Sequence, residues 1–121
     1  MFNEENQKNN QRKITTMLMN IGIPVKSKGF EFIRRAITIA VNRPETLSSL
    51  TKKLYPEVAK SVGTTTSCVE RNIRYALCNA WNSGGAARFK NATHINLYDA
   101  ENMTSGEFIA IATETILLDN I

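Results

Sequence analysis

Residues 55–81 read YPEVAKSVGTTTSCVERNIRYALCNAW, and this stretch predicts two helices joined by a tight turn. Pro56 suits the first turn of a helix, where the N–H group that proline lacks would have no partner. Gly63 comes directly after Val62, the last apolar residue of the first predicted helix. It suits the left-handed conformation in which many helices end. Hydroxyl-bearing residues follow as N-cap candidates, and Ser67 with Glu70 fits the S-x-x-E capping box. The stretch is therefore predicted to be a helix-turn-helix.

The second predicted helix, about residues 66–81, has an apolar stripe on one side and a polar face on the other. The stripe repeats at helical spacing and consists of Val69, Ile73, Ala76, Leu77 and Ala80. At about 100° per residue, the polar face spans an arc of about 100° and consists of Ser67, Glu70, Arg71, Arg74 and Cys78. Recognition helices place such a face in the major groove of DNA. An arginine pairs with guanine through two hydrogen bonds and a glutamate accepts one from cytosine, so Glu70, Arg71 and Arg74 are predicted to read a G·C-containing site.

Side chains beside this face are predicted to bind DNA phosphates. They are Thr65, Thr66 and Ser67 at the start of the helix and Arg88 and Lys90 beyond its end. The alternative for the polar face is a solvated charged surface, on which Glu70 closes the capping box and pairs with Arg74 at i, i+4.

The composition favours a single, all-α domain that binds a polyanion. The chain has 121 residues, of which 42% are hydrophobic, and this is enough for one compact core. Helical periodicity recurs in most segments and strand-like alternation is nearly absent, so we expect about five to six helices. Residues 1–90 carry all 15 Lys and Arg side chains, whereas residues 91–121 carry none. A basic body is suited to phosphate contacts, although a pI of about 9.3 is also common among small soluble proteins.

Several classes of function are not supported by any residue pattern. The chain has no nucleophile–base pair, metal-ligand cluster or Gly-rich phosphate loop, so we expect a non-enzymatic protein without cofactor or metal. The single histidine, His94, has no acid, nucleophile or metal partner at a suitable spacing. Cys68 and Cys78 lie ten residues apart on one predicted helix, about 15 Å along its axis, and cannot form a disulfide. Free thiols, no apolar run of membrane-spanning length and no signal peptide favour the cytoplasm.

The rest of the chain is expected to support the motif. Residues 1–13 are rich in Asn and Gln and have few apolar side chains, so we expect a disordered arm before a domain of residues 14–121. Helical spacing of apolar residues predicts further helices at residues 14–21, about 29–42, about 47–54 and 86–91. A T-x-x-E cap at Thr104 precedes a final helix that is apolar on more than one face. Such a helix needs burial on both sides or a partner chain.

Residues 50–81, LTKKLYPEVAKSVGTTTSCVERNIRYALCNAW, closely resemble the DNA-binding effector domain of the stage-zero sporulation protein A family. The resemblance continues upstream in IGIPVKSKGFEFIRRAI, residues 21–37, and returns in TSGEFIAIATETI, residues 104–116. It covers about residues 14–118 and is most specific in LYPEVAK and VERNIRYA. Between residues 82 and 103 few positions match. The resemblance implies a helical, sporulation-related transcription regulator whose partner is double-stranded DNA.

The resemblance also assigns residues. Glu70, Arg71 and Arg74 match the family's base-reading positions in type, which implies a target similar to the family's short G·C-containing box. Cys68 stands where the family usually has a basic residue, so one phosphate contact is expected to be missing. Family members use the last region for contacts between domains bound in tandem, and this implies homodimer contacts through Phe108, Ile111 and Ile116. The alternative for these three is the core of a monomer. The resemblance further suggests the sigma subunit of RNA polymerase as a partner.

The resemblance covers only the effector domain of these regulators, and this allows two functions. In the resembled regulators a receiver domain precedes the effector domain, and no receiver segment precedes residue 14 in this sequence. We therefore expect a stand-alone effector domain that binds DNA without phosphorylation. The rival function is an interaction protein that pairs with a full-length regulator and modulates it, with DNA binding secondary.

Overall fold

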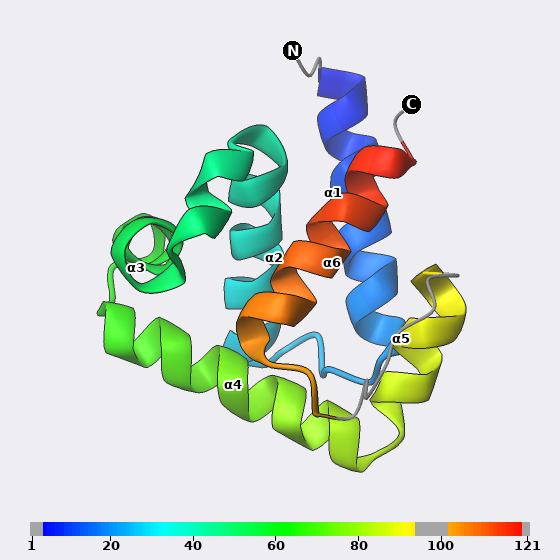
Figure 1. The fold of residues 1–121 in the computed structure, drawn as a ribbon. Coiled ribbons are helices and arrows are strands. Elements are labelled where there is room, and N and C mark those ends of the chain that lie inside the picture. The colour runs from blue at the N-terminus through cyan, green and yellow to red at the C-terminus, as the bar shows by residue number, and fades with distance from the viewer. Residues whose placement is uncertain (1–3, 94–101, 120–121) are drawn as a thin grey trace.

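The structure is a computed structural model that describes residues 4–93 and 102–119, and these residues form helices and connecting turns without any strand (Figure 1). The elements are α1 (Glu4–Asn20), α2 (Lys28–Asn42), η1 (Pro44–Ser48), η2 (Leu50–Leu54), α3 (Tyr55–Val62), α4 (Thr66–Asn82), α5 (Gly85–Thr93) and α6 (Ser105–Leu118). The predicted all-α class is confirmed. The segment predicted as one helix at about residues 47–54 is instead a short 3-10 helix followed by one π-helical turn, which leads directly into α3.

Helix α2 lies at the centre of the fold, because it packs against α4 and α6 and also contacts α1 and α3. Its buried face consists of Gly29, Phe30, Phe32, Ile33, Ala36, Ile37, Ala40 and Val41. Ser27 begins the helix as its N-cap, since the Ser27 hydroxyl accepts a hydrogen bond from the N–H of Phe30 at 3.1 Å. Helix α4 runs along one edge of the molecule, far from the start of α1 (Figure 1). The central helix thus supports one side of α4 and leaves its other side exposed.

Helix α6 crosses α2 and also contacts α1 and α4, which explains why it is apolar on more than one face. Phe108 and Ile116 have exposed fractions of 0% and 1% and belong to the core of the monomer. The expectation that these two side chains contact a second copy of the protein is therefore wrong. Of the three predicted dimer contacts, only Ile111 is partly exposed.

The structure also corrects the predicted disordered arm at residues 4–13, which form the first half of α1. Asn10 is buried, and the Gln11 side chain donates a hydrogen bond to the Thr38 hydroxyl on α2 at 2.6 Å. The low content of apolar residues gave a wrong prediction here, because it does not account for the helix that follows. Once the buried residues from Ile14 onward have nucleated a helix, adding turns at its N-terminal end costs little further free energy. Glu4 and Glu5 favour this extension through their charge at the helix N-terminus.

The predicted cap of the last helix is confirmed. The Thr104 hydroxyl accepts a hydrogen bond from the N–H of Glu107 at 3.1 Å, and the Glu107 carboxylate accepts one from the N–H of Thr104 at 2.9 Å. The hydrogen bond of the Glu107 carboxylate with the backbone of Thr104, and then its interaction with the Thr104 side chain, hold the pKa of Glu107 below its ordinary value of 4.5. The cap therefore stabilises α6 most when Glu107 is ionised.

We expect this cap to weaken in acid. Because the pKa of Glu107 is lower in the folded than in the unfolded state, its contribution to stability is present above about pH 4.5 and is lost as the pH falls through the folded pKa. Glu107→Gln should show a smaller loss of unfolding free energy between about pH 6 and about pH 3 than the wild type. The measurement is urea unfolding followed by circular dichroism. Glu114→Gln, an exposed position on the same helix, is the control and should retain the wild-type loss.

Candidate nucleic-acid interface

Helices α3 and α4 form the predicted helix-turn-helix. Gly63 ends α3 with a φ of 72°, in the left-handed region that favours glycine. Thr65 is the N-cap of α4, because its hydroxyl accepts a hydrogen bond from the N–H of Cys68 at 3.1 Å. The predicted capping box of Ser67 and Glu70 is therefore wrong, and Ser67 lies inside the first turn of the helix.

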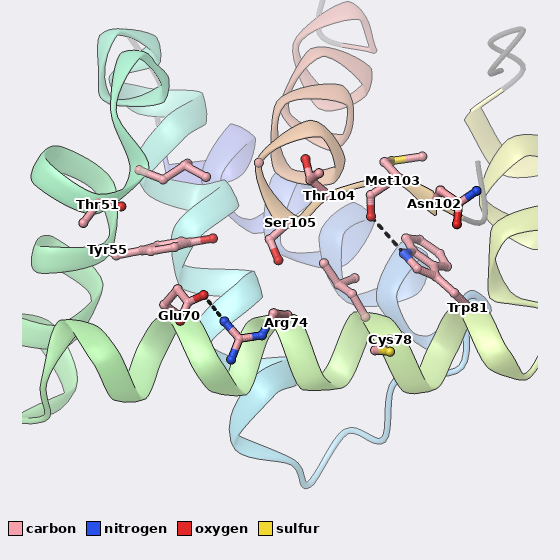
Figure 2. A pocket seen from close by; sticks show the side chains of 13 residues that line it. Thr51, Tyr55, Glu70, Arg74, Cys78, Trp81, Asn102, Met103, Thr104 and Ser105 are labelled. Carbon is pink, nitrogen blue, oxygen red and sulfur yellow. Dashed lines mark hydrogen bonds and ion pairs between the residues drawn. The ribbon is translucent and has the colours of Figure 1, made fainter. Parts of the chain in front are cut away.

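The apolar stripe of α4 faces the core, and the predicted base-reading residues do not. Val69, Ile73, Leu77 and Ala80 are buried. Arg71 and Arg74 are exposed, and Arg71 has no ion pair or hydrogen bond within residues 4–93 and 102–119. Glu70 is half-buried at the edge of the outward face, where its carboxylate forms an ion pair with Arg74 (Figure 2). The structure thus brings all three side chains onto one helix, with the two arginines more exposed than the glutamate.

The Glu70–Arg74 ion pair does not prevent Arg74 from binding a base. Exposed pairs at i, i+4 on a helix stabilise by about 0.3–0.5 kcal/mol. A bidentate contact with guanine discriminates by about 1–3 kcal/mol. A pair this weak can be exchanged for another partner, and in the free protein Glu70 holds the Arg74 side chain over α4.

One residue of this face was missed by the sequence prediction. Tyr75 has an exposed fraction of 67% and follows Arg71 by four residues, so the two side chains lie on neighbouring turns of one face. The sequence alone could have placed Tyr75 on this face, because a side chain four residues after Arg71 is rotated from it by only about 40° around the helix axis. Arg71, Arg74, Tyr75 and Cys78 are therefore exposed on the outward face of α4, together with Ser67, Asn79 and Asn82.

The predicted phosphate-contacting residues separate into two groups. Thr65 and Ser67 are exposed, Thr66 is half-buried, and Lys90 is exposed on α5. Arg88 instead donates hydrogen bonds to backbone carbonyl oxygens, from Nε to Asn20 at 2.7 Å and from Nη2 to Ile21 at 3.2 Å. The guanidinium of Arg88 thus binds carbonyl oxygens at the end of α1 and connects α1 to α5. Arg88 is nevertheless exposed, and its contact with a DNA phosphate stays a prediction.

A groove of about 570 Å³ lies between α4, η2 and the start of α6 (Figure 2). Glu70 and Arg74 line it on one side and Ser105 on the other. The Trp81 indole donates a hydrogen bond to the carbonyl oxygen of Met103 at 3.3 Å and closes one end. Trp81 also packs against Phe89 and Phe108, as expected for a core aromatic residue.

Tyr55 extends from the start of α3 toward this groove, with an exposed fraction of 2%. Its hydroxyl group is buried and has no hydrogen-bond partner of normal geometry within the described residues. Burial, and to a lesser extent the charge of Glu70, raise the pKa of Tyr55 to about 12, although Ser105 and Arg74 act in the opposite direction. The tyrosine is therefore held in its neutral form.

Tyr55→Phe is expected to remove a loss of stability in alkali. Because the pKa is about 12 in the folded protein and 10.0 ordinarily, the contribution of Tyr55 is present below about pH 10 and is lost as the pH rises toward 12. At neutral pH the variant should be as stable as the wild type or more so, since the hydroxyl has no hydrogen bond of normal geometry to lose among the described residues. Urea unfolding at about pH 7 and about pH 11 measures both effects. Tyr75→Phe, at an exposed tyrosine, is the control and should keep the alkaline loss.

Residues 4–93 and 102–119 show neither a metal site nor a membrane-spanning helix. These residues contain no group of three or more His, Cys, Asp or Glu side chains that could hold a metal ion. None of their helices is long and apolar enough to cross a membrane. Cys68 is half-buried and Cys78 is exposed, both as free thiols. His94 lies outside the described residues.

The comparison with known families agrees with this geometry. A family model described as "Sporulation initiation factor Spo0A C terminal" matches residues 14–116. The match contains the whole helix-turn-helix and all of α2, η1, η2 and α5. The family is a helical DNA-binding domain of a transcription factor, not an enzyme family. Because the match covers most of the chain, this protein belongs to the family of Spo0A C-terminal domains, which bind DNA and regulate transcription in sporulation.

Proposed function

We propose that this protein regulates transcription by reading a short G·C-containing box through the outward face of α4. The observation that carries this proposal is the exposure of Arg71 and Arg74 on the second helix of a helix-turn-helix whose opposite face is buried. Arginine provides two donors in a fixed geometry that matches guanine O6 and N7.

The packing of α4 supports this function because it holds the helix rigidly. A Cβ atom on Gly29 would lie 2.5 Å from the Ala76 Cβ and 2.8 Å from the carbonyl oxygen of Asn72. Only glycine permits so close an approach of α2 to α4. Base readout needs side chains held within a fraction of an ångström of the productive position, and a helix fixed by direct backbone contact provides this.

The start of α4 is suited to a DNA phosphate. Its first N–H groups point outward from the helix and carry partial positive charge, and the exposed hydroxyls of Thr65 and Ser67 lie beside them. Lys90, exposed on α5, adds a further positive charge beyond the other end of α4. These residues would fix the position of the helix, while the two arginines would distinguish the bases.

The proposal is tested by an electrophoretic mobility shift with a family-type G·C-containing box and a scrambled box of the same composition. The expected result is tighter binding to the intact box at each salt concentration, because part of the affinity comes from base contacts that salt does not remove. Equal binding to both duplexes would contradict sequence-specific readout. Binding to neither duplex would favour the rival interaction protein.

Pairing of two copies on adjacent boxes is a separate proposal. Ile111 is partly exposed and Leu118 has an exposed fraction of 55%, so α6 retains a small apolar surface for a partner. Two boxes should then bind more tightly than the product of two single-box affinities, because pairing raises the effective concentration.

The same surface of α6 would serve the rival function, in which the partner is a full-length regulator. The sigma subunit of RNA polymerase stays a prediction from the resemblance.

A further inference from the structure

A second groove, of about 490 Å³, lies beside the first turn of α4 on the flank opposite the groove of Figure 2. Cys68 lines this groove and Glu70 lines the other one, and two residues of a helix turn the side-chain direction by about 200°. The remaining wall comes from the segment before α2, from the first turn of α2 and from the turn of the helix-turn-helix, and it includes Lys26, Lys28 and Thr64. We call it the lysine groove.

The lysine groove carries an unbalanced positive charge. Lys26 and Lys28 are both exposed, and neither has an ion pair or hydrogen bond within the part of the chain that the structure describes. Glu31 also lines the groove, but its carboxylate forms ion pairs with Arg34 and with Arg35, the latter at 2.7 Å. The negative charge of Glu31 is therefore balanced by two arginines of α2, and the ammonium groups of Lys26 and Lys28 remain available to an anion.

The backbone that carries the two lysines is held in a fixed position relative to α4. They flank Ser27, whose hydroxyl accepts a hydrogen bond from the N–H of Phe30 at 3.1 Å and donates one to the carbonyl oxygen of Pro24 at 2.8 Å. The next residue along the chain is Gly29, which lies against the backbone of α4. Any movement of α4 into DNA would therefore carry the lysines with it.

We propose that Lys26 and Lys28 bind the phosphates of one DNA strand while α4 occupies the major groove. The inference rests on the proposed function. The major groove is about 12 Å wide and a helix with its side chains is about 10–12 Å across, so both flanks of an inserted helix lie next to a phosphate backbone. The first turn of α4 carries no charged side chain on the flank at Cys68. Lys26 and Lys28, on the neighbouring wall of the lysine groove, supply the positive charge on that flank.

The test is the salt dependence of DNA binding by the double variant Lys26→Ala/Lys28→Ala. Each lost phosphate contact should reduce the slope of log K against log salt by about 0.9, so the double variant should lose about 2. Affinity should fall by the same factor for the intact and the scrambled box, since phosphates carry no base identity. Lys26→Arg/Lys28→Arg should keep the wild-type slope, because it preserves both charges.

A matched control separates a local contact from a change in net charge. Lys8→Ala/Arg12→Ala removes the same charge from exposed positions on α1, whose N-terminal half lies at the opposite end of the molecule from α4 (Figure 1). This control should keep the wild-type slope. An equal reduction in both double variants would overturn the inference, because the effect would then depend on overall charge alone.

The outcomes also distinguish this inference from the proposed function. A wild-type slope in Lys26→Ala/Lys28→Ala, with sequence preference intact in the wild type, would overturn the inference and leave the function standing. Absence of DNA binding by the wild type would overturn both. Because both side chains are exposed, the fold should survive, and circular dichroism checks this. Each single variant should lose about half of the slope change, which provides a second measurement if the double variant is unstable.

Discussion

Replacing Ile116 with glutamate is expected to unfold the protein rather than to separate two copies of it. Ile116 has an exposed fraction of 1% and packs in the hydrophobic core. Loss of a large core side chain costs about 2–5 kcal/mol, and an unpaired buried charge costs about 3–5 kcal/mol more. Together these effects are comparable with the whole stability of a small domain, about 5–15 kcal/mol.

Urea unfolding and circular dichroism measure this effect directly. The matched control is Leu118→Glu, which adds the same charge two residues later on α6 at an exposed fraction of 55%. The control should change the unfolding free energy by no more than about 0.5 kcal/mol. A folded Ile116→Glu with wild-type stability would contradict the burial of this residue. Leu118→Glu also serves as the folded variant with which pairing on two adjacent boxes is tested.

The helix-turn-helix could be predicted from sequence because its signals are local. Gly63 marks the end of one helix through its own backbone preference, and the apolar stripe of the next helix repeats within four turns. The N-cap could not be chosen from four consecutive hydroxyl residues, since each provides the same acceptor. Only the position of the turn relative to the core selects Thr65 and leaves Ser67 inside the helix.

The remaining errors concern properties that depend on distant residues. The apolar faces of the last helix fit a central core helix as well as a dimer contact, and the decision comes from its packing on α1, α2 and α4. Arg88 was predicted only as a phosphate contact, and its structural role was missed because the Asn20 carbonyl group that it binds lies 68 residues away in the sequence. No local pattern marks such a contact. Exposure of Arg71 and Arg74 was predictable, because it follows from helical geometry once the buried stripe is known.

Arg71→Ala is expected to lose about 5- to 150-fold in preference for the intact box over the scrambled one, since a bidentate guanine contact contributes about 1–3 kcal/mol of discrimination. Stability should change little, because the side chain is exposed and has no partner within the described residues. Mobility shifts with both boxes and urea unfolding give the two values. Lys8→Ala is the control for loss of one positive charge and should keep the preference, because Lys8 belongs to the N-terminal half of α1, which lies at the opposite end of the molecule from α4 (Figure 1).

Arg74→Ala should weaken binding more than Arg71→Ala, because it also leaves Glu70 without its ion-pair partner. An uncompensated carboxylate at the edge of the outward face would repel the phosphates of both boxes, in addition to the lost base contact. Adding Glu70→Gln to Arg74→Ala should therefore restore part of the affinity for both boxes, without restoring preference for the intact one. If Glu70→Gln restored nothing in this background while reducing preference in the wild type, Glu70 would act by reading a base, and its ion pair with Arg74 would not matter for binding.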